Sequence, residues 1–231
     1  VGRARYVLMT NDAGTIIDDG VACRFAEDWY YVTTTTTGAE RVYQTMLWWN
    51  AQWRLDVDIA NVSVALAAVN IAGPRSRELL ATLVDDIDLS SEALPYMGVR
   101  EGQVAGISAR VFRVGFVGEL GFEVHVAAGH GEALWDAIFA MGREFGVLPF
   151  GVEAQRVLRL EKGHIIVSQD TDAMTTPEEA HMTWAISRRK PFFVGKRSIE
   201  VRDRYLSKRK LVGFGIDDPF MPLPQESNLV V

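Results

Sequence analysis

The order of apolar patterns between residues 61 and 145 constrains the fold of this chain more than any other feature. Strands are expected at residues 62–71, 99–105, 107–116 and 121–127. Helices are expected from Gly73-Pro74 onward, with Leu79, Leu80 and Leu83 inward, and over residues 131–145. Such an order of strand, helix, strands and helix predicts an α+β fold with mixed sheets and helices on one face.

Local signals predict further elements on both sides of this region. Residues 6–22 are typical of a hairpin with a turn at Asn11 to Gly14, and residues 29–35 of a third strand. Thr37 to Glu40 match a capping box, which predicts a helix. The stripe of that helix, Val42, Met46, Trp49 and Trp53, is expected in the core. Later elements are expected as helices at residues 151–161, 177–184 and 196–206 and a strand from Leu211.

Composition narrows the classes of protein. The 231 residues are 48% apolar and 23% charged, which is typical of a globular protein. No apolar run approaches the ~20 residues that span a bilayer, and no signal peptide is present, so no membrane association is expected. The single cysteine, Cys23, excludes an internal disulfide, and the four scattered histidines have no metal-ligand spacing, so no metal site is expected. These features favour a reducing, cytoplasmic location.

The charge is unevenly distributed. The net charge of −6 disfavours nucleic acid as a partner. Residues 188–210 nevertheless hold ten Lys or Arg against Glu200 and Asp203, so this segment carries +8 and the remainder −14. A solvated helix face is the simpler interpretation, and a dock for an acidic partner or a polyanionic ligand tail is the alternative.

Carboxylates are the main candidates for chemistry, because nucleotide-binding glycine motifs, CxxC and GxSxG are all absent from the sequence. Asp18 and Asp19 follow an apolar pair on an expected strand. Either one of them enters a pocket, or the strand frays and both are solvated. Glu123 shares one strand face with His125 and could equally be an ordinary exposed residue. Gln155 and Arg159 form an i, i+4 pair whose default interpretation is a solvated helix face.

A polar segment between apolar elements is a further candidate for a binding loop. Residues 166–179 place Gln169, Asp170 and Asp172 after an apolar run, and Thr176-Pro177-Glu178-Glu179 is typical of a capped helix start. Polar loops held by buried elements often carry binding groups.

Seven segments together resemble the aminomethyltransferase family, whose founding member is the glycine-cleavage T-protein. They occur in family order at residues 2–6, 14–19, 72–77, 115–123, 158–163, 170–177 and 194–196. Thr33 to Thr37, Val99 to Gly102 and Gln169 to Asp172 are most similar to the C-terminal folate-binding region of heterotetrameric sarcosine oxidase alpha subunits. Because the chain begins at Val1 and its last residues resemble the start of a strand, it is expected to be part of a longer protein.

The resemblance implies a function and a set of site residues. Sarcosine is oxidised elsewhere in such complexes, and tetrahydrofolate takes the one-carbon unit to give 5,10-methylenetetrahydrofolate. By motif alignment Asp19 is the catalytic carboxylate, Asp18 its neighbour, Tyr6 a pocket residue and Glu123 the partner of the pterin ring. Arg159 is carried over as a folate-site residue.

Three aligned positions depart from the family pattern. Phe116 replaces a Tyr, Thr35 replaces an Asn that approaches the counterpart of Asp19, and Gln155 replaces a folate-contacting Arg. These three are retained as expected folate-site positions. Two alternatives therefore stay open, a stand-alone aminomethyltransferase with a lipoyl-bound donor and a non-catalytic folate-binding module.

The resemblance also implies an organisation. Residues 1–60 are expected to belong to a first folate-binding subdomain, 61–150 to a ferredoxin-like subdomain, 151–210 to a helical segment and 211–231 to the start of a truncated C-terminal β-barrel. FAD, FMN and NAD are expected elsewhere in the complex, with other sarcosine oxidase subunits and folate as partners.

Overall fold

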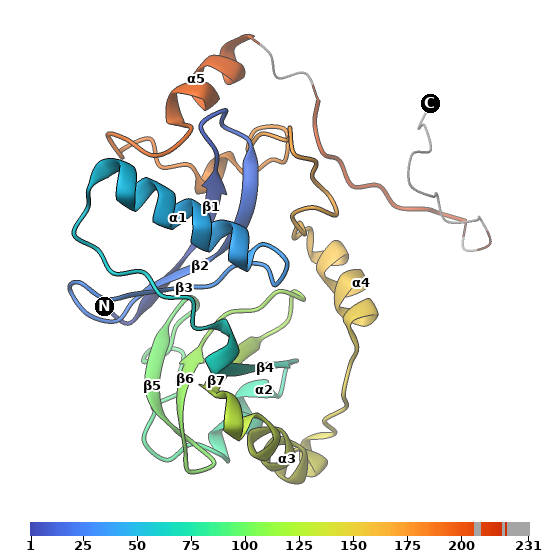
Figure 1. The fold of residues 1–231 in the computed structure, drawn as a ribbon. Coiled ribbons are helices and arrows are strands. Elements are labelled where there is room, and N and C mark those ends of the chain that lie inside the picture. Colours follow the sequence, from blue (N-terminus) through green and yellow to red (C-terminus); the bar gives the residue numbers. More distant parts are fainter. Residues whose placement is uncertain (206–208, 219, 221–231) are drawn as a thin grey trace.

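Two antiparallel sheets frame the protein, whose computed structural model describes residues 1–205, 209–218 and 220 (Figure 1). The first sheet has the order β1-β2-β3, with β1 (Arg3–Thr10), β2 (Ile16–Arg24) and β3 (Tyr30–Val32). The second has the order β4-β7-β6-β5, with β4 (Leu66–Ala72), β5 (Val99–Val104), β6 (Ile107–Phe112) and β7 (Gly121–Ala127). In the described residues the α-helices are α1 (Ala39–Trp53), α2 (Ser76–Ala81), α3 (Gly131–Gly142), α4 (Val152–Lys162) and α5 (Lys196–Tyr205). Short 3-10 turns are η1 (Ser63–Ala65), η2 (Ala128–His130), η3 (Arg143–Phe145) and η4 (Thr183–Ala185).

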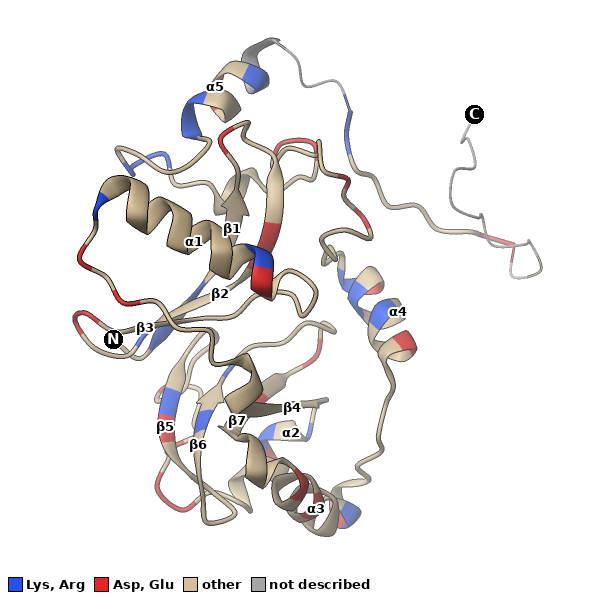
Figure 2. Ribbon diagram, viewed as in Figure 1, with Lys and Arg blue, Asp and Glu red and all other residues tan. Residues whose placement is uncertain are grey.

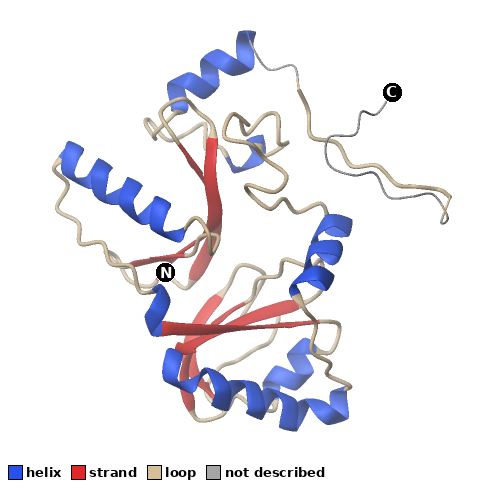
Figure 3. Cartoon of the chain, turned by 45° about the vertical axis from the view of Figure 1, so that its right-hand side comes forward, coloured by secondary structure: helices blue, strands red, loops and turns tan. Residues whose placement is uncertain are grey.

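The predicted α+β fold is confirmed, and every pair of neighbouring strands is antiparallel. The main core lies on one face of the second sheet. Phe122, Val124 and Val126 alternate along β7 and point into this core, as their period-two spacing predicts. Leu80 of α2 and Leu134 of α3 meet them there and are fully buried. Figure 3 shows both helices on this side of the sheet, which confirms the prediction of helices on one face.

The opposite face of the second sheet meets the first sheet. A smaller cluster of buried apolar residues fills the junction and comprises Ala4, Cys23, Val99, Phe112 and Val114. The backbone also links the sheets, because Ala4 N–H donates to the carbonyl of Met97 at 2.8 Å. Helices α2 and α3 therefore cover one face of the second sheet, and its other face is turned toward β2 of the first sheet.

The predicted helix forms as α1, but the predicted capping box is absent and the predicted core stripe is not fully buried. Gly38 is its N-cap and no side chain caps it, while the Glu40 carboxylate accepts a hydrogen bond from Gln44 at 2.8 Å. Val42 is the buried residue of this helix, whereas Trp53 is 41% exposed. The prediction that the tryptophan stripe is core is therefore wrong, because the packing of α1 reaches only its N-terminal part.

Two later expectations also differ. The capping box at Thr176 forms, but the chain completes a single turn rather than a helix over 177–184. Met182 N–H bonds back to the Pro177 carbonyl at 2.7 Å and His181 adopts a left-handed φ of 56°, which is how helices end. Residues 209–218 contain no strand, so the strand expected from Leu211 is absent there. The remainder of the expected barrel start lies outside the described residues.

Among the described helices, none combines the length and the apolarity that crossing a bilayer requires.

Candidate active site

The two carboxylates of β2 point to opposite sides of the first sheet. β2 continues to Arg24 without fraying, so successive residues alternate between its faces. Asp18 is 0% exposed and Asp19 is half-buried. The interpretation that the strand frays is therefore wrong, and both carboxylates have protein partners.

Asp18 is an internal anchor. Its Oδ1 accepts hydrogen bonds from the backbone N–H of Asp19 at 2.8 Å and of Thr35 at 3.3 Å. Its Oδ2 accepts one from the Thr35 hydroxyl at 3.2 Å. Gly38 lies so close that a Cβ there would collide with Asp18 Oδ2. Thr35 therefore supports Asp18 rather than Asp19, in contrast to the contact that the resemblance implied.

Asp19 pairs with Tyr6 on the facing strand β1. The Tyr6 hydroxyl donates to Asp19 Oδ2 at 2.7 Å, and the Tyr6 ring packs on Trp184 with the centroids 5.1 Å apart. Burial raises the pKa of Asp19, the hydrogen bond from Tyr6 opposes this, and the nearby charge of Asp18 raises the pKa further. Burial and the Asp19 carboxylate also raise the pKa of Tyr6, so its hydroxyl stays protonated and remains a donor.

His164 and Phe116 form a second pair of residues, and His164 is close enough for its charge to act on Asp19. His164 Nδ1 lies 2.7 Å from the Phe116 carbonyl oxygen, and the two rings stack with centroids 5.7 Å apart. A carbonyl can only accept, so Nδ1 carries the proton and Nε2 is left for another partner. The charge of His164 acts to lower the pKa of Asp19, which puts the imidazole within electrostatic reach of that carboxylate.

Arg159 holds the start of the polar loop in place. It is 3% exposed and donates to both carboxylate oxygens of Asp170, with Nη2 3.2 Å from Oδ1. It also donates to the His164 carbonyl at 3.0 Å, and Asp170 Oδ2 accepts the Ile166 N–H at 2.7 Å. The default of a solvated Gln155–Arg159 face is therefore wrong for Arg159, whose paired charge fixes the backbone around His164.

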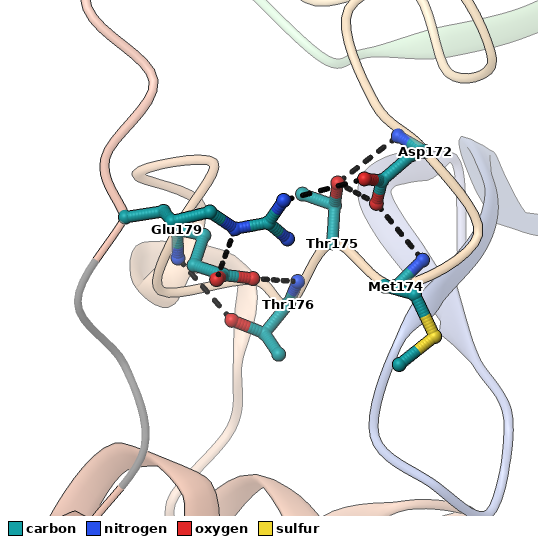
Figure 4. A network of polar contacts seen from close by, with 6 residues as sticks. Asp172, Met174, Thr175, Thr176 and Glu179 are labelled. Atoms are coloured by element: carbon teal, nitrogen blue, oxygen red, sulfur yellow. Dashed lines mark hydrogen bonds and ion pairs between the residues drawn. The ribbon is translucent and has the colours of Figure 1, made fainter.

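The rest of the polar loop is braced by its own side chains (Figure 4). The Asp172 carboxylate accepts hydrogen bonds from Thr175 Oγ1 at 2.7 Å and from Met174 N–H at 2.9 Å. The Glu179 carboxylate and the Thr176 hydroxyl accept from each other's backbone N–H, at 2.9 and 3.3 Å. This bracing reaches the site, because the Thr175 carbonyl accepts the N–H of Ile16 at the start of β2.

Glu123 approaches the junction from the second sheet. His125 Nε2 lies 3.3 Å from Glu123 Oε2, and the Tyr31 hydroxyl lies 3.0 Å from Nδ1 of the same ring. Since a carboxylate accepts, the consistent arrangement is Tyr31 O–H to Nδ1 and Nε2–H to Glu123. Burial and then the Glu123 charge raise the pKa of Cys23 to about 12. Glu123 is therefore not an isolated surface residue.

Asp19 lies on the face of β2 that meets the second sheet at Cys23. Cys23 is buried in the junction between the sheets, and Asp19 shares its face of β2 because the two differ by four residues. Four residues correspond to about 13 Å of strand. Glu123 therefore lies near the Cys23 end of this face, and Asp19 lies four residues along β2 from Cys23.

Gln155 lies elsewhere. It lines a cavity of about 580 Å³ along β4, together with Asn70, Arg75, Trp135 and Phe150. Neither Asp19 nor Glu123 lines this cavity. Of the expected site residues, Tyr6, Asp18, Asp19 and Thr35 form one connected cluster, Phe116 and Arg159 join it through His164, Glu123 lies across the junction, and Gln155 is not brought to the cluster.

Sequence reasoning missed three contributors. His164 is one of the four scattered histidines to which the sequence assigned no role, although it follows directly on the helix C-cap Gly163. The partner of Arg159, Asp170, and the ring partner of Tyr6, Trp184, depend on contacts across 11 and more residues. The polar segment 166–179 was the one sequence signal that pointed toward them.

Comparisons with known proteins agree with this architecture. Residues 1–190 match the family described as the GCVT N-terminal domain. The sarcosine oxidase subunit alpha of Corynebacterium sp. (strain U-96) is 43% identical over 213 residues, which are 91% of this chain and 22% of that protein. The aminomethyltransferase of Chloroherpeton thalassium is 30% identical over 223 residues, which are 96% of this chain and 59% of that protein.

A solved structure is also similar. The glycine cleavage system aminomethyltransferase T from Bartonella henselae superposes with a TM-score of 0.73 at 25% identity, covering 88% of this chain and 54% of that one. The chain thus spans about a fifth of the sarcosine oxidase subunit and somewhat over half of the aminomethyltransferases. The chain belongs to the aminomethyltransferase family, through its GCVT N-terminal domain.

Proposed function

We propose that this chain is the tetrahydrofolate-dependent one-carbon transfer region of a sarcosine oxidase alpha subunit. In this role it forms 5,10-methylenetetrahydrofolate from the one-carbon unit released when sarcosine is oxidised. The observation that carries the proposal is the half-buried Asp19, which accepts the Tyr6 hydroxyl and whose pKa is raised by burial. The 43% identity to a sarcosine oxidase subunit alpha, against 30% to an aminomethyltransferase, favours this assignment over a stand-alone enzyme with a lipoyl-bound donor.

The donor and acceptor set fits a reduced pterin. Such a ring offers adjacent N–H and NH₂ donors, which suit a carboxylate that can accept two hydrogen bonds. Glu123 retains acceptor capacity after its bond to His125, and that bond fixes its orientation. Phe116 lacks the hydroxyl of the family Tyr, and its carbonyl is used to orient His164.

Asp19 is proposed as the catalytic residue. Tetrahydrofolate supplies the nitrogen atoms that accept the one-carbon unit. A carboxylate beside such a nitrogen stabilises developing positive charge and accepts its proton. The raised pKa of Asp19 makes this carboxylate a better proton acceptor near neutrality than a solvated aspartate. Asp18 and Thr35 hold the backbone at Asp19 in place through the Asp19 N–H bond.

The proposal extends to the whole protein. We place the FAD, FMN and NAD groups and the oxidation of sarcosine outside this segment. Other sarcosine oxidase subunits are the proposed partners, and the cytoplasm is the proposed location.

The test uses the full protein and separates binding from transfer. Asp19→Asn is expected to lower methylenetetrahydrofolate formation by about 100-fold or more, the usual contribution of a positioned acid–base group, while tetrahydrofolate binding is retained. Glu123→Gln is expected to weaken binding in calorimetric titration by about tenfold or more, because one charge-assisted acceptor is lost. Glu119→Gln, an exposed carboxylate in the same region, is the matched control. Unchanged product formation by Asp19→Asn would favour the non-catalytic folate-binding module.

A further inference from the structure

The C-terminal half of α1 presents aromatic rings to solvent beside a basic loop. The Trp49 and Trp53 rings pack with their centroids 4.7 Å apart and their planes tilted by 31°, and the Phe192 ring meets Trp53 edge-on at 5.3 Å. Phe192 is 61% exposed. Large aromatic side chains are expected to bury most of their surface, so a contiguous exposed group indicates an interaction site.

The segment that contains Phe192 is rich in cations. Residues 188–202 carry six Lys or Arg and one Glu, a net charge of +5, whereas the whole chain carries −6. Figure 2 shows the basic residues gathered on α5 and on the loop that leads to it. Arg188, Arg189, Lys190 and Arg197 are exposed, and no carboxylate in the described part of the chain pairs with any of these four. We call the following seven residues the aromatic–basic patch: Trp49, Trp53, Arg188, Arg189, Lys190, Phe192 and Arg197.

The patch is hollowed rather than flat. A cavity of about 630 Å³ lies between α1 and the start of α5, and its lining includes Trp49, Phe192, Phe193, Lys196 and Arg197. One hydrogen bond closes the loop before α5, from Lys196 Nζ to the Lys190 carbonyl at 2.6 Å. The cavity therefore combines aromatic rings with the cations of Lys196 and Arg197.

We propose that the aromatic–basic patch binds an acidic segment of a partner protein that inserts one apolar side chain into this cavity. Charge complementarity supports the acidic partner, since Arg197 lines the cavity and the exposed Arg188, Arg189 and Lys190 directly precede its lining residues Pro191 and Phe192 in the chain. The aromatic floor supports an apolar anchor, because Trp and Arg dominate the energetics of protein interfaces.

Two other partners are less consistent with the patch. The carboxylates of Asp12 and Glu200 also line the cavity and would repel phosphates at its centre. Asp56 and Asp58 follow α1 directly and are exposed, which would repel an anionic lipid surface. Neither feature opposes a peptide whose acidic groups contact the rim and whose apolar group enters the cavity.

The test is binding of a defined peptide to the full protein, independent of folate. The probe is a fluorescein-labelled peptide of ten Glu and Asp residues with one central Phe, measured by fluorescence anisotropy at low and high salt. Saturable binding that weakens with salt is expected. The same peptide with Ala in place of Phe is expected to bind about tenfold more weakly, and a Lys-based version is not expected to bind.

Variants locate the binding. Arg188→Glu/Arg189→Glu and Phe192→Ala are each expected to weaken binding about tenfold or more, and all three side chains are exposed, so the fold should tolerate their loss. Arg143→Glu and Trp135→Ala, an exposed charge and an exposed ring on the second sheet's helix, are the matched controls. Absent peptide binding, equal losses in the control variants, or equal binding of the Lys-based peptide would each overturn the proposal. Binding to phosphatidylserine vesicles in place of the peptide would also overturn it and assign the patch to membranes.

Discussion

Gly38→Ala tests whether the packing around Asp18 is as tight as the structure indicates. Gly38 has φ −90° and ψ −13°, which alanine adopts readily, so backbone considerations alone predict a gain of about 0.4–1 kcal/mol. The added Cβ would instead collide with Asp18 Oδ2 and lie 2.7 Å from Thr35 Oγ1. Overpacking of this kind costs about 1–3 kcal/mol, and losing one hydrogen bond to a buried carboxylate costs about 1.5–3 kcal/mol more.

The net expectation is a loss of about 2–5 kcal/mol in the free energy of unfolding. For a chain of this size each kcal/mol lowers Tm by about 2–4 °C, so a fall of roughly 4–20 °C is expected. Urea unfolding should give a lower midpoint with an unchanged slope, because the surface exposed on unfolding is the same.

Two further variants make the result specific. Gly129→Ala is the matched control, since an added Cβ there meets no atom within 4 Å, and its Tm should stay close to that of the wild type. In an Asp18→Ala background the obstructing carboxylate is gone, so Gly38→Ala should cost much less than it does alone. Equal stability of Gly38→Ala and the wild type, or an equal cost in both backgrounds, would refute the reasoning.

Three other predictions follow from the pKa shifts. Tyr6→Phe removes the hydrogen bond that lowers the pKa of Asp19, so the pKa of Asp19 should rise. The acidic limb of the pH–rate profile should then move to higher pH. A limb that does not move would contradict the role of the Tyr6–Asp19 pair. Hydrogen bonds from Thr175 and Met174 lower the pKa of Asp172 in the folded protein. The ionised Asp172 therefore stabilises the fold fully above the ordinary aspartate pKa of about 4, and this stabilisation is lost as the pH falls through the lowered pKa of the folded state. Thr175→Val should therefore reduce the dependence of Tm on pH in this acidic range, and an identical dependence would count against it. Cys23 should react with a thiol reagent at neutral pH only after unfolding, because burial raises its pKa to about 12, and fast labelling of the folded protein would disprove this.

Elements with strong local patterns could be predicted from the sequence. The period-two alternation of Phe122, Val124 and Val126 identified both the strand and its buried face. The helix expected over residues 151–161 forms as α4, and Gly163 ends it with a left-handed φ of 83°. The capping box at Thr176 formed, but the chain makes only one helical turn after it. A capping box specifies where a helix can begin and not how far the helix continues.

The arrangement of the site residues was harder to predict from the sequence, because it depends on tertiary contacts. Sequence established that Asp18 and Asp19 lie on opposite strand faces, because neighbouring strand residues always do. It could not establish which of them is anchored by Thr35, 17 residues away, and which faces the second sheet. Arg159 and Asp170 likewise form an ion pair only because the chain reverses at Gly163.

The sequence by itself determined the strands of both sheets, the buried face of β7 and the carboxylates available for chemistry, because these follow from side-chain type and local spacing. Tertiary structure alone decided that Asp19 meets Tyr6, that His164 pairs with the Phe116 carbonyl, and that Trp48 and Trp53 of α1 remain exposed. The physical reason is that the burial and electrostatic environment of a side chain depend on the residues that pack against it, and these residues are distant in the chain.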